Sequence, residues 1–339
     1  MSRRVHYIWF LILALPIFNQ LKAQDPVFSQ FFSTPIQLNP ALAGSALTPR
    51  LYLNYRNQWP ELSNAYITYA ATYDQHFDRA NSGLGISILS DVAGDGIYQT
   101  NKISAAYAYD FQFSKDFYLK GGLEAGLAQV GVNWDKLVFL DQIDPLRGPT
   151  DISGNPFPTD ETRPANENAF YVDFAAGVVA FTKDFHLGMS IKHLNAPDES
   201  IISNSSVFGI VPLRFTIHAG AEINLKSTNN KILNKAFISP NIMYVRQGEF
   251  NQLNLGAYGN FGSIYGGAWF RHTFGNADAV IVLGGYQYKT FKIGYSYDVT
   301  VSELAGSTGG AHEISLTMLF DSPRKRRNKQ YLNCLKMFR

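Results

Sequence analysis

The residues that could perform chemistry are scattered along the chain. There are seven histidines, and no two of them have the spacing of metal ligands. Lys192-His193 and His312-Glu313 come near the ends of predicted strands, where polar side chains are ordinary. No serine lies in the context of a nucleophile elbow, and no glycine-rich loop leads from a strand into a helix. We therefore expect no catalytic activity, no cofactor and no metal centre.

Two acidic stretches offer weaker candidates. Residues 91–96 read Asp-Val-Ala-Gly-Asp-Gly, which lacks the regular ligand spacing and final glutamate of an EF-hand, so we expect a turn. Residues 135–168 combine five prolines with several carboxylates. This loop could bind a cation or a partner, or it could be a solvated acidic loop. Its candidate binding residues are Asp141, Asp144, Asp151, Asp160 and Glu161.

The elements that carry these residues are strands, because apolar and polar residues alternate. Two apolar series near the end of the chain are Phe291, Ile293, Tyr295, Tyr297 and Val299, and Ile314, Leu316, Met318 and Phe320. Small and charged residues lie between them. A period of two gives a strand one apolar and one polar face. Aromatic residues at the ends of the apolar face and charges on the other are typical of a wall with lipid outside and water inside.

The alternation recurs about fourteen times, an even number, as a single-chain bacterial barrel requires. The predicted strands are residues 50–59, 64–77, 82–91, 100–113, 117–134, 169–181, 185–194, 213–225, 236–246, 250–261, 264–274, 278–288, 291–299 and 311–320. We therefore expect an all-β fold, a transmembrane outer-membrane β-barrel of antiparallel strands over residues 50–320.

Composition agrees with a membrane barrel. Of the 339 residues, 17 % are charged and 14 % are aromatic, whereas soluble domains are about 25 % charged. A net charge of +2 gives no reason to expect a nucleic-acid partner. The single cysteine, Cys334, excludes a disulfide framework. The bilayer is therefore one expected partner, and nucleic acid is not.

The connections between strands predict the orientation. The even-numbered connections are mostly short, whereas the odd-numbered ones include residues 92–99, 135–168, 195–212 and 300–310. Outer-membrane barrels have short periplasmic turns and longer external loops. We therefore predict that the first strand starts in the periplasm and that both termini are periplasmic.

The two ends of the chain differ from the barrel pattern. Residues 1–23 form a predicted signal peptide, with a basic start and an apolar run shorter than the roughly 20 residues of a spanning helix. Residues 321–339 form a basic tail. The tail could dock on an acidic periplasmic surface, or it could simply be solvated. Its candidate docking residues are Arg324, Lys325, Arg326 and Arg327.

Residues 24–49 form an irregular segment that cannot join a sheet, because Pro26, Pro35 and Pro40 each remove a backbone donor. Burying one of its large apolar side chains is worth about 1.5–3 kcal/mol. The segment could be a loose leader, could cover a partner's surface or could fill the barrel lumen. We favour the lumen, entered from the periplasmic side. The predicted plug residues are Phe28, Phe31, Phe32, Leu38, Asn39 and Pro40.

Charged residues fall on the polar faces of the predicted strands. They are Arg56, Asp74, Asp110, Glu124, Asp173, Lys192, Glu222 and Asp298. A charge at the lipid midplane costs about 2–4 kcal/mol, so these side chains belong in the lumen. There they could line a channel, or they could pair with one another and fill it.

Residues near both ends of the mature chain resemble the PorP/SprF family. At the start these are residues 24–31, Gln-Asp-Pro-Val-Phe-Ser-Gln-Phe, and residues 38–44, Leu-Asn-Pro-Ala-Leu-Ala-Gly. Further on they are Arg-Asn-Gln-Trp-Pro at 56–60 and His-Glu-Ile-Ser-Leu at 312–316. The basic tail with Cys334 also fits, whereas Leu335 stands where many relatives have proline.

The resemblance implies an outer-membrane barrel of Bacteroidetes-type bacteria that belongs to the type IX secretion system and has no catalytic activity. Some members of this family are needed for gliding motility. The implied partners are a secreted cell-surface adhesin with a C-terminal secretion domain and periplasmic or outer-membrane secretion components. Two other classes stay open. One is a plugged porin or a transporter of lipids or hydrophobic compounds, and the other is an outer-membrane hydrolase, for which no Ser–His constellation is visible.

Overall fold

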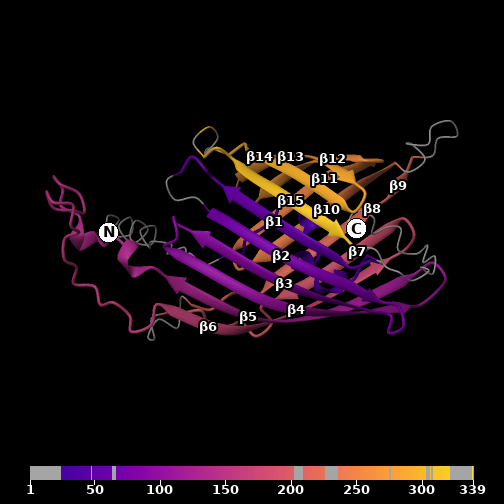
Figure 1. The fold of residues 1–339 in the computed structure, drawn as a ribbon, viewed down its shortest axis with the longest axis horizontal. Coiled ribbons are helices and arrows are strands. Elements are labelled where there is room, and N and C mark those ends of the chain that lie inside the picture. Colours follow the sequence, from indigo (N-terminus) through magenta and orange to yellow (C-terminus); the bar gives the residue numbers. More distant parts are fainter. Residues whose placement is uncertain are drawn as a thin grey trace, which may run out of the picture.

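The computed structural model describes residues 24–46, 48–62, 66–201, 209–225, 236–274, 276–302, 306, 308–320 and 338. Its strands form one closed antiparallel ring (Figure 1), in which β1 pairs with β2 and β15, and β10 pairs with β8 and β11. β8 and β9 are parts of one spanning strand, because both pair with β10 and only Glu222 separates them. The barrel therefore has 14 spanning strands, which confirms the predicted fold.

The observed strands agree with the predicted ones to within a few residues. They are β1 (Arg50–Gln58), β2 (Tyr66–Phe77), β3 (Ser82–Ala93), β4 (Tyr98–Gln112), β5 (Tyr118–Val132), β6 (Asn168–Phe181), β7 (Phe185–Lys192), β8 (Arg214–Ala221), β9 (Ile223–Asn224), β10 (Phe237–Gln247), β11 (Phe250–Phe261), β12 (Ile264–Thr273), β13 (Asn276–Tyr288), β14 (Phe291–Thr300) and β15 (Ala311–Leu319). The largest difference is at residues 92–99, predicted as one of the longer connections. There the chain makes a turn at residues 94–97, where Gly94, Asp95 and Gly96 have positive φ.

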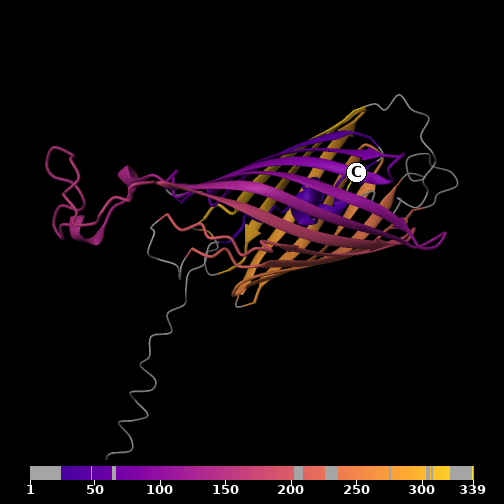
Figure 2. The same cartoon turned by 90° about the horizontal axis from the view of Figure 1, so that it is seen from below.

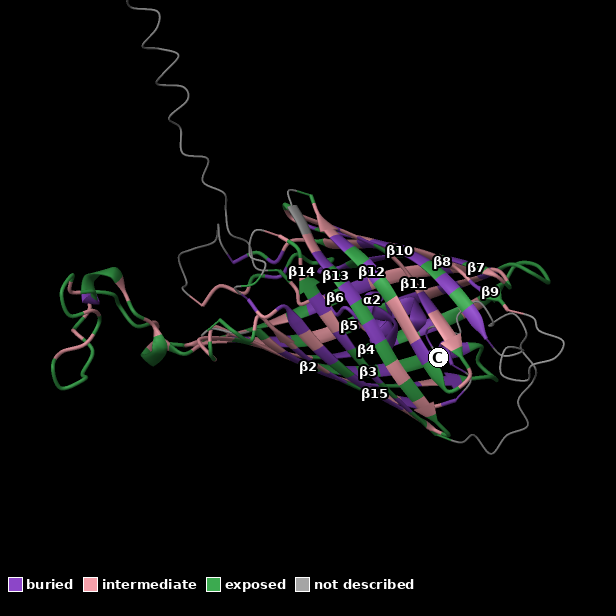
Figure 3. Ribbon diagram, turned by 90° about the horizontal axis from the view of Figure 1, so that it is seen from above, coloured by how far each residue is buried: buried purple, intermediate pink, exposed green. Residues whose placement is uncertain are grey.

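Successive residues of each strand point to opposite faces of the wall (Figure 3). β7 shows the pattern over its whole length, and its outward, exposed residues are Phe185, Leu187, Met189 and Ile191. The residues between them face the lumen and are buried. The wall is thus apolar outside and polar inside, as a lipid-embedded barrel requires. Among the described residues, none of the helices has the length and apolarity of a membrane-spanning helix.

The two ends of the barrel carry different connections. At one end the strands are joined by short turns, such as residues 182–184, 262–263 and 289–290. At the other end lie the long connections, among them residues 193–213 and the arm, residues 133–167, which extends well beyond the strands (Figures 1 and 2). We call these the short-turn end and the long-loop end. The division is the one that the sequence predicts.

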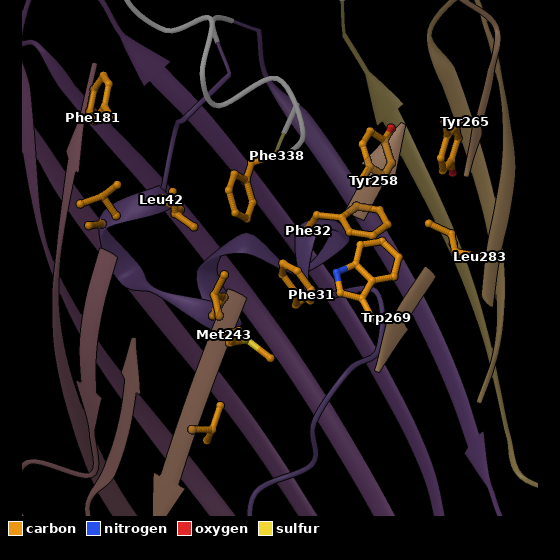
Figure 4. Packing of buried hydrophobic residues seen from close by; sticks show 14 of the residues in the cluster. Phe31, Phe32, Leu42, Phe181, Met243, Tyr258, Tyr265, Trp269, Leu283 and Phe338 are labelled. Carbon is orange, nitrogen blue, oxygen red and sulfur yellow. The ribbon is translucent and has the colours of Figure 1, made fainter. Parts of the chain in front are cut away.

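The core of the protein lies inside the ring. The lumen segment, residues 24–46, runs through the barrel, and all of its residues from Phe28 to Ala46 are buried except Gln37, which is half-buried. Phe31, Phe32 and Leu42 are among the residues of this segment that pack with inward-facing wall residues in the largest cluster (Figure 4), whereas Ile36 and Phe28 belong to two smaller clusters. A wall that turns its polar face inward therefore still encloses an apolar centre, which the lumen segment supplies.

Tyr295 on β14 tests the register of the wall. Its side chain is 47 % exposed on the outer face, and the adjacent Ser296 is fully buried. We predict that Tyr295→Asp lowers the free energy of unfolding in lipid vesicles by about 1–2 kcal/mol, because carboxylates on the lipid face destabilise barrels, although less than Lys or Arg. Tyr295→Phe is the matched control. It keeps the aromatic ring and loses only the hydroxyl that lies 2.7 Å from His312 Nδ1, so it should be destabilised less than Tyr295→Asp. Urea titration followed by tryptophan fluorescence measures both, and equal stability of the two variants would contradict the register.

Candidate functional site

The candidate site is the lumen segment together with the wall that holds it. The segment begins at the long-loop end, where the backbone N–H of Asp25 donates to Gln247 Oε1 at 3.0 Å. It ends at the short-turn end, where the N–H of Gly44 donates to Asp74 Oδ2 at 2.7 Å. The predicted entry from the end where β1 starts is therefore wrong. The prediction that both ends of the mature chain lie on one side of the membrane is also wrong, because Asp25 and the end of β15 lie at opposite mouths. The segment starts at the long-loop end, whereas β1 begins with Arg50 at the short-turn end. The chain therefore crosses the whole lumen before β1 begins.

Prolines give the lumen segment its local shape. Three short helical turns follow one another: η1 (Phe31–Ser33), α2 (Pro35–Leu38) and η2 (Pro40–Leu42). Pro35 and Pro40 stand at the first helical position of their turns, where a missing N–H costs nothing. The side chain of Asn39 caps η2 by accepting from the N–H of Ala41 at 3.0 Å. Compact turns of this kind satisfy much of their own backbone and fit inside a barrel.

Aromatic contacts fix the middle of the segment. Phe31 meets the Trp269 ring edge-on with ring centroids 5.9 Å apart, and Phe32 stacks on the same ring at 6.1 Å. Phe32 also packs against Tyr258 at 5.2 Å (Figure 4). The Lys292 ammonium lies over the rings of Phe32 and Tyr258, at 5.6 and 5.3 Å from their centroids. A cation facing aromatic rings is stabilised by their quadrupoles, so this cluster joins the segment to β11, β12 and β14.

Glu313 on β15 is the main polar anchor of the segment. Its carboxylate accepts the backbone N–H of Ser29 at 2.7 Å and that of Gln30 at 3.0 Å. The Gln30 side chain donates back to the Glu313 carbonyl oxygen at 3.0 Å. Glu313 also pairs with Arg56 of β1 at 3.3 Å, its cross-strand neighbour. Because Glu313 is fully buried, each of these partners is needed to offset the loss of water.

A buried ion network surrounds this anchor. Asp298 Oδ2 lies 3.0 Å from Arg56 and 2.7 Å from Arg271, and it accepts the Ser29 hydroxyl at 2.6 Å. Arg271 in turn pairs with Asp278 at 2.5 Å. The network spans β1, β12, β13 and β14 and includes one residue of the lumen segment. These lumenal charges therefore pair with one another between nearby strands, which is the second of the two alternatives left open by the sequence.

The wall has glycine residues, without side chains, where the second half of the segment lies against it. A Cβ added at Gly122 of β5 would lie 2.3 Å from the backbone nitrogen of Ala41, and one at Gly83 of β3 would lie 2.1 Å from the carbonyl oxygen of Ala43. Such approaches are impossible for any other residue type without movement of backbone. The Asn39 amide donates to the carbonyl oxygens of Val178 and Met189, at 3.2 and 3.1 Å. The segment thus packs directly on the backbone of the wall.

The short-turn end is closed by a second buried ion pair. Arg50 pairs with Asp74 at 2.6 Å, and both side chains are fully buried. Phe338, the last described residue, is buried in the lumen (Figure 4). Its carbonyl oxygen accepts hydrogen bonds from Arg50 Nη1 and, at 3.2 Å, from Tyr52 Oη. The predicted docking residues of the tail, Arg324, Lys325, Arg326 and Arg327, lie outside the described residues.

At the long-loop end, His193 ties the segment to the wall. Its Nε2 lies 2.9 Å from the Asp25 carboxylate, and its Nδ1 lies 3.0 Å from that of Asp173 on β6. Burial alone would lower the pKa of His193, but Asp25 and Asp173 raise that pKa to about 9. Burial alone would raise the pKa of Asp25, but His193 and Arg214 hold that pKa well below its ordinary value. The bridge is therefore charged at neutral pH.

A vestibule of about 670 Å³ remains above the segment at the long-loop end. Residues 24–27 form part of its lining, and Arg271 and Asp298 of the buried network line it as well. Aromatic side chains complete the wall, namely Trp59, Tyr66, Tyr98 and Phe250. The vestibule is thus bounded from below by the lumen segment. The lumen below it is packed with side chains.

Three of the acidic residues of the arm accept hydrogen bonds from backbone N–H groups within the arm. Asp144 Oδ1 accepts the N–H groups of Leu146 and Arg147 at 2.8 and 2.9 Å, and Asp151 Oδ1 accepts those of Ser153 and Asn155. Asp141 accepts the N–H of Asp160 at 2.7 Å and the Thr159 hydroxyl. Asp160 and Glu161 are exposed. Within the described part of the chain, no three His, Cys, Asp or Glu side chains are grouped as metal ligands.

All six predicted plug residues are buried in the lumen, but several of their partners were not predicted. The sequence marks Glu313 as a polar residue near a strand end and as part of the motif at 312–316, but it does not indicate contact with the segment, and it gives no role to Trp269, Lys292 or Gly122. Inward positions occupied by glycine, such as Gly83 and Gly122, were the available signal, because a glycine on a strand marks close approach of another backbone. That these residues function as a plug stays a prediction.

The geometry defines the class of protein: a closed ring of spanning strands, apolar outside and polar inside, is an outer-membrane β-barrel. The chain belongs to the PorP/SprF family, because the family model described as type IX secretion system membrane protein PorP/SprF matches residues 20–318. This family and this fold are those of a secretion membrane protein rather than of an enzyme. No curated protein matches the chain.

Solved structures of other outer-membrane proteins are similar to this chain, and the first of them shares its fold. The Ralstonia pickettii toluene transporter TbuX is 8 % identical with a TM-score of 0.50, over 85 % of this chain and 94 % of its own. The Acinetobacter baumannii outer membrane protein Omp33 is 9 % identical with a TM-score of 0.44, over 81 % of this chain and 99 % of its own. At such identities the likeness is one of fold alone.

Gly122 tests how closely the lumen segment fits the wall. We predict that Gly122→Val displaces the segment, because the new side chain would occupy the place of the Ala41 backbone. The measurement is chymotryptic cleavage within residues 28–32 of the barrel in vesicles, which should become at least about tenfold faster once the segment leaves the lumen. Gly284→Val is the matched control, since an added Cβ there has no neighbour within 4 Å. Equal cleavage of the two variants would contradict the close fit.

His193 gives the long-loop end a pH dependence. Its folded pKa of about 9 lies above the ordinary value of 6.5, so its stabilisation is fully present below about pH 6.5 and is lost as the pH rises through about 9. A spin label at Val27→Cys, two residues from Asp25 and in the lining of the vestibule, in a Cys334→Ser background, should be immobile at pH 6–7 and become mobile by about pH 10. His193→Asn, which tolerates the positive φ of 59°, should be mobile throughout. A label insensitive to both changes would exclude the bridge.

Proposed function

We propose that the protein helps to secrete, or to hold at the cell surface, a protein with a C-terminal secretion domain, and that this cargo is an adhesin. It would work with other periplasmic or outer-membrane components of the type IX secretion system. Membership of the PorP/SprF family supports the pathway. The packed lumen supports a barrel that holds a protein rather than one that conducts solutes, since the segment occupies the path from one mouth to the other. We propose no catalytic step.

The packed lumen is the observation that carries this proposal. Two buried ion networks, at Arg50 and at Arg56, join the lumen segment to the wall at different depths. Removing one partner of such a buried pair costs about 3–5 kcal/mol. A segment held in this way is part of the folded barrel, so we assign it a structural plug role rather than that of a gate that opens in each transport cycle.

We further propose that the long-loop end faces outward and the short-turn end faces the periplasm, as in other outer-membrane barrels. The mature N-terminus would then lie at the outer mouth, while the polypeptide after β15 would leave on the periplasmic side. Two cysteine variants, each in a Cys334→Ser background, test this orientation with a membrane-impermeant maleimide. Ser153→Cys, in the arm, should be labelled in intact cells. Asp116→Cys, in a short turn, should be labelled only after lysis. The opposite labelling pattern would reverse the orientation.

A plugged transporter of hydrophobic compounds is the second candidate. The fold shared with TbuX, a toluene transporter, and an apolar groove of about 380 Å³ on the outer wall favour it. Leu53, Tyr69 and Ile88 are among the residues that line this groove. The groove faces lipid and not the lumen, because these side chains are on the exposed faces of β1, β2 and β3. We therefore rank this function second.

A deletion strain distinguishes the two functions. We predict that loss of the protein removes most of its cargo from the cell surface, by at least about tenfold in antibody labelling of intact cells, while uptake of toluene and oleate is unchanged. Reintroducing the wild-type chain should restore the label, since the barrel is proposed to hold the cargo. Normal surface labelling together with impaired uptake would contradict secretion and favour the transporter.

A further inference from the structure

We propose that the arm, residues 133–167, is a docking element that inserts aliphatic side chains into a partner protein's apolar pocket framed by lysine or arginine. The inference rests on the proposed function only in placing the arm outside the cell. It adds an interaction surface and the chemistry of the partner that fits it.

Three aliphatic side chains on the arm are almost fully exposed. Leu140 is 90 % exposed, Leu146 is 96 % exposed and Ile152 is 94 % exposed. The outward-facing apolar residues of the strands, such as Leu123 at 65 %, have neighbours on the wall and lipid to cover them. The arm leaves β5 and β6 and extends beyond the barrel (Figure 2), so lipid does not cover its side chains. These side chains leave apolar surface in water, and burial of that surface against a partner would be favourable.

Contacts within the arm give it a defined conformation, so the three aliphatic side chains have defined positions on its surface. At its base, Arg163 pairs with Asp135 at 2.9 Å and with Glu167. Further out, the Gln142 amide donates to the Phe157 carbonyl oxygen at 2.6 Å. Isolated bridges join Asp144 to Gly148 and Thr150 to Pro156, while η3 (Trp134–Lys136) and η4 (Leu140–Gln142) add turns. A pre-ordered element loses less entropy on binding.

Charge selects the kind of partner. Residues 138–161 carry five acidic groups, Asp141, Asp144, Asp151, Asp160 and Glu161, and one basic group, Arg147, a net charge of −4. The pKa of Asp141 and that of Asp151 are lowered by hydrogen bonds, mainly from the backbone N–H groups of Asp160 and Asn155 respectively, so both stay ionised in mildly acidic media. A strongly acidic arm is repelled by anionic lipid headgroups and attracted by basic protein surfaces.

The experiment places a photo-crosslinking amino acid at Ser153, next to Ile152, in the full-length barrel of intact cells. After irradiation, mass spectrometry identifies the attached peptide. We expect one protein adduct, mapped to aliphatic residues flanked by lysine or arginine. Leu140→Ser/Leu146→Ser/Ile152→Ser should reduce its yield at least about tenfold, since burial of each such side chain is worth about 1.5–3 kcal/mol. Asp160→Asn/Glu161→Gln should reduce the yield about threefold, as exposed charge pairs do.

The matched control changes three other exposed arm positions, Thr162→Ala/Ala165→Ser/Asn166→Ala, and should leave the adduct unchanged. An adduct that survives the triple serine variant overturns the inference. So does an adduct with lipid, with a second copy of this chain or with an acidic surface, and so does the absence of any adduct. Surface labelling of the cargo is scored in the same cells. If that labelling does not depend on the protein while the adduct behaves as expected, the proposed function fails and the docking arm stands.

Discussion

The structure depends on the contact between the Glu313 carboxylate and the backbone N–H groups of Ser29 and Gln30. A barrel wall in lipid turns its polar side chains inward, and each buried polar group there needs a partner. Glu313 meets this need by binding peptide groups of the same chain and by pairing with Arg56. The polar lumen and the lumen segment are therefore complementary. Either one alone would leave buried donors or charges unsatisfied.

The shape of the wall follows from the same constraint. The lumen segment makes its own turns and brings backbone as well as side chains to the wall, so the wall has glycine where the two backbones meet. Gly122 lies under Ala41, and Gly83 lies under Ala43. At the height of η1 the wall has large residues instead, and Trp269 packs against both Phe31 and Phe32. The interior is thus packed like a soluble core, and a vestibule remains at the long-loop end.

The sequence predicted the wall well and the site partly. Period-two alternation is a local signal that each strand carries independently, so the strand number, the faces and the position of Tyr295 could be predicted. The destination of Phe28, Phe31 and Phe32 could also be inferred, because three prolines exclude the segment from the sheet. The partners of the segment could not, since Ser29 and Glu313 are 284 residues apart and no local pattern joins them. The sequence did not predict that the segment begins at the long-loop end. Alternation gives the direction of strands and not the path of an irregular segment.

The measurement that tests the central claim most directly is single-channel conductance in planar bilayers. The wild-type barrel is compared with a variant that lacks residues 25–44 and keeps the signal peptide. If the lumen segment fills the pore, the wild type conducts poorly and the deletion raises the conductance several-fold, since a 14-stranded barrel without its filling is wide enough for water. Unchanged conductance in a deletion variant that still folds would contradict the account.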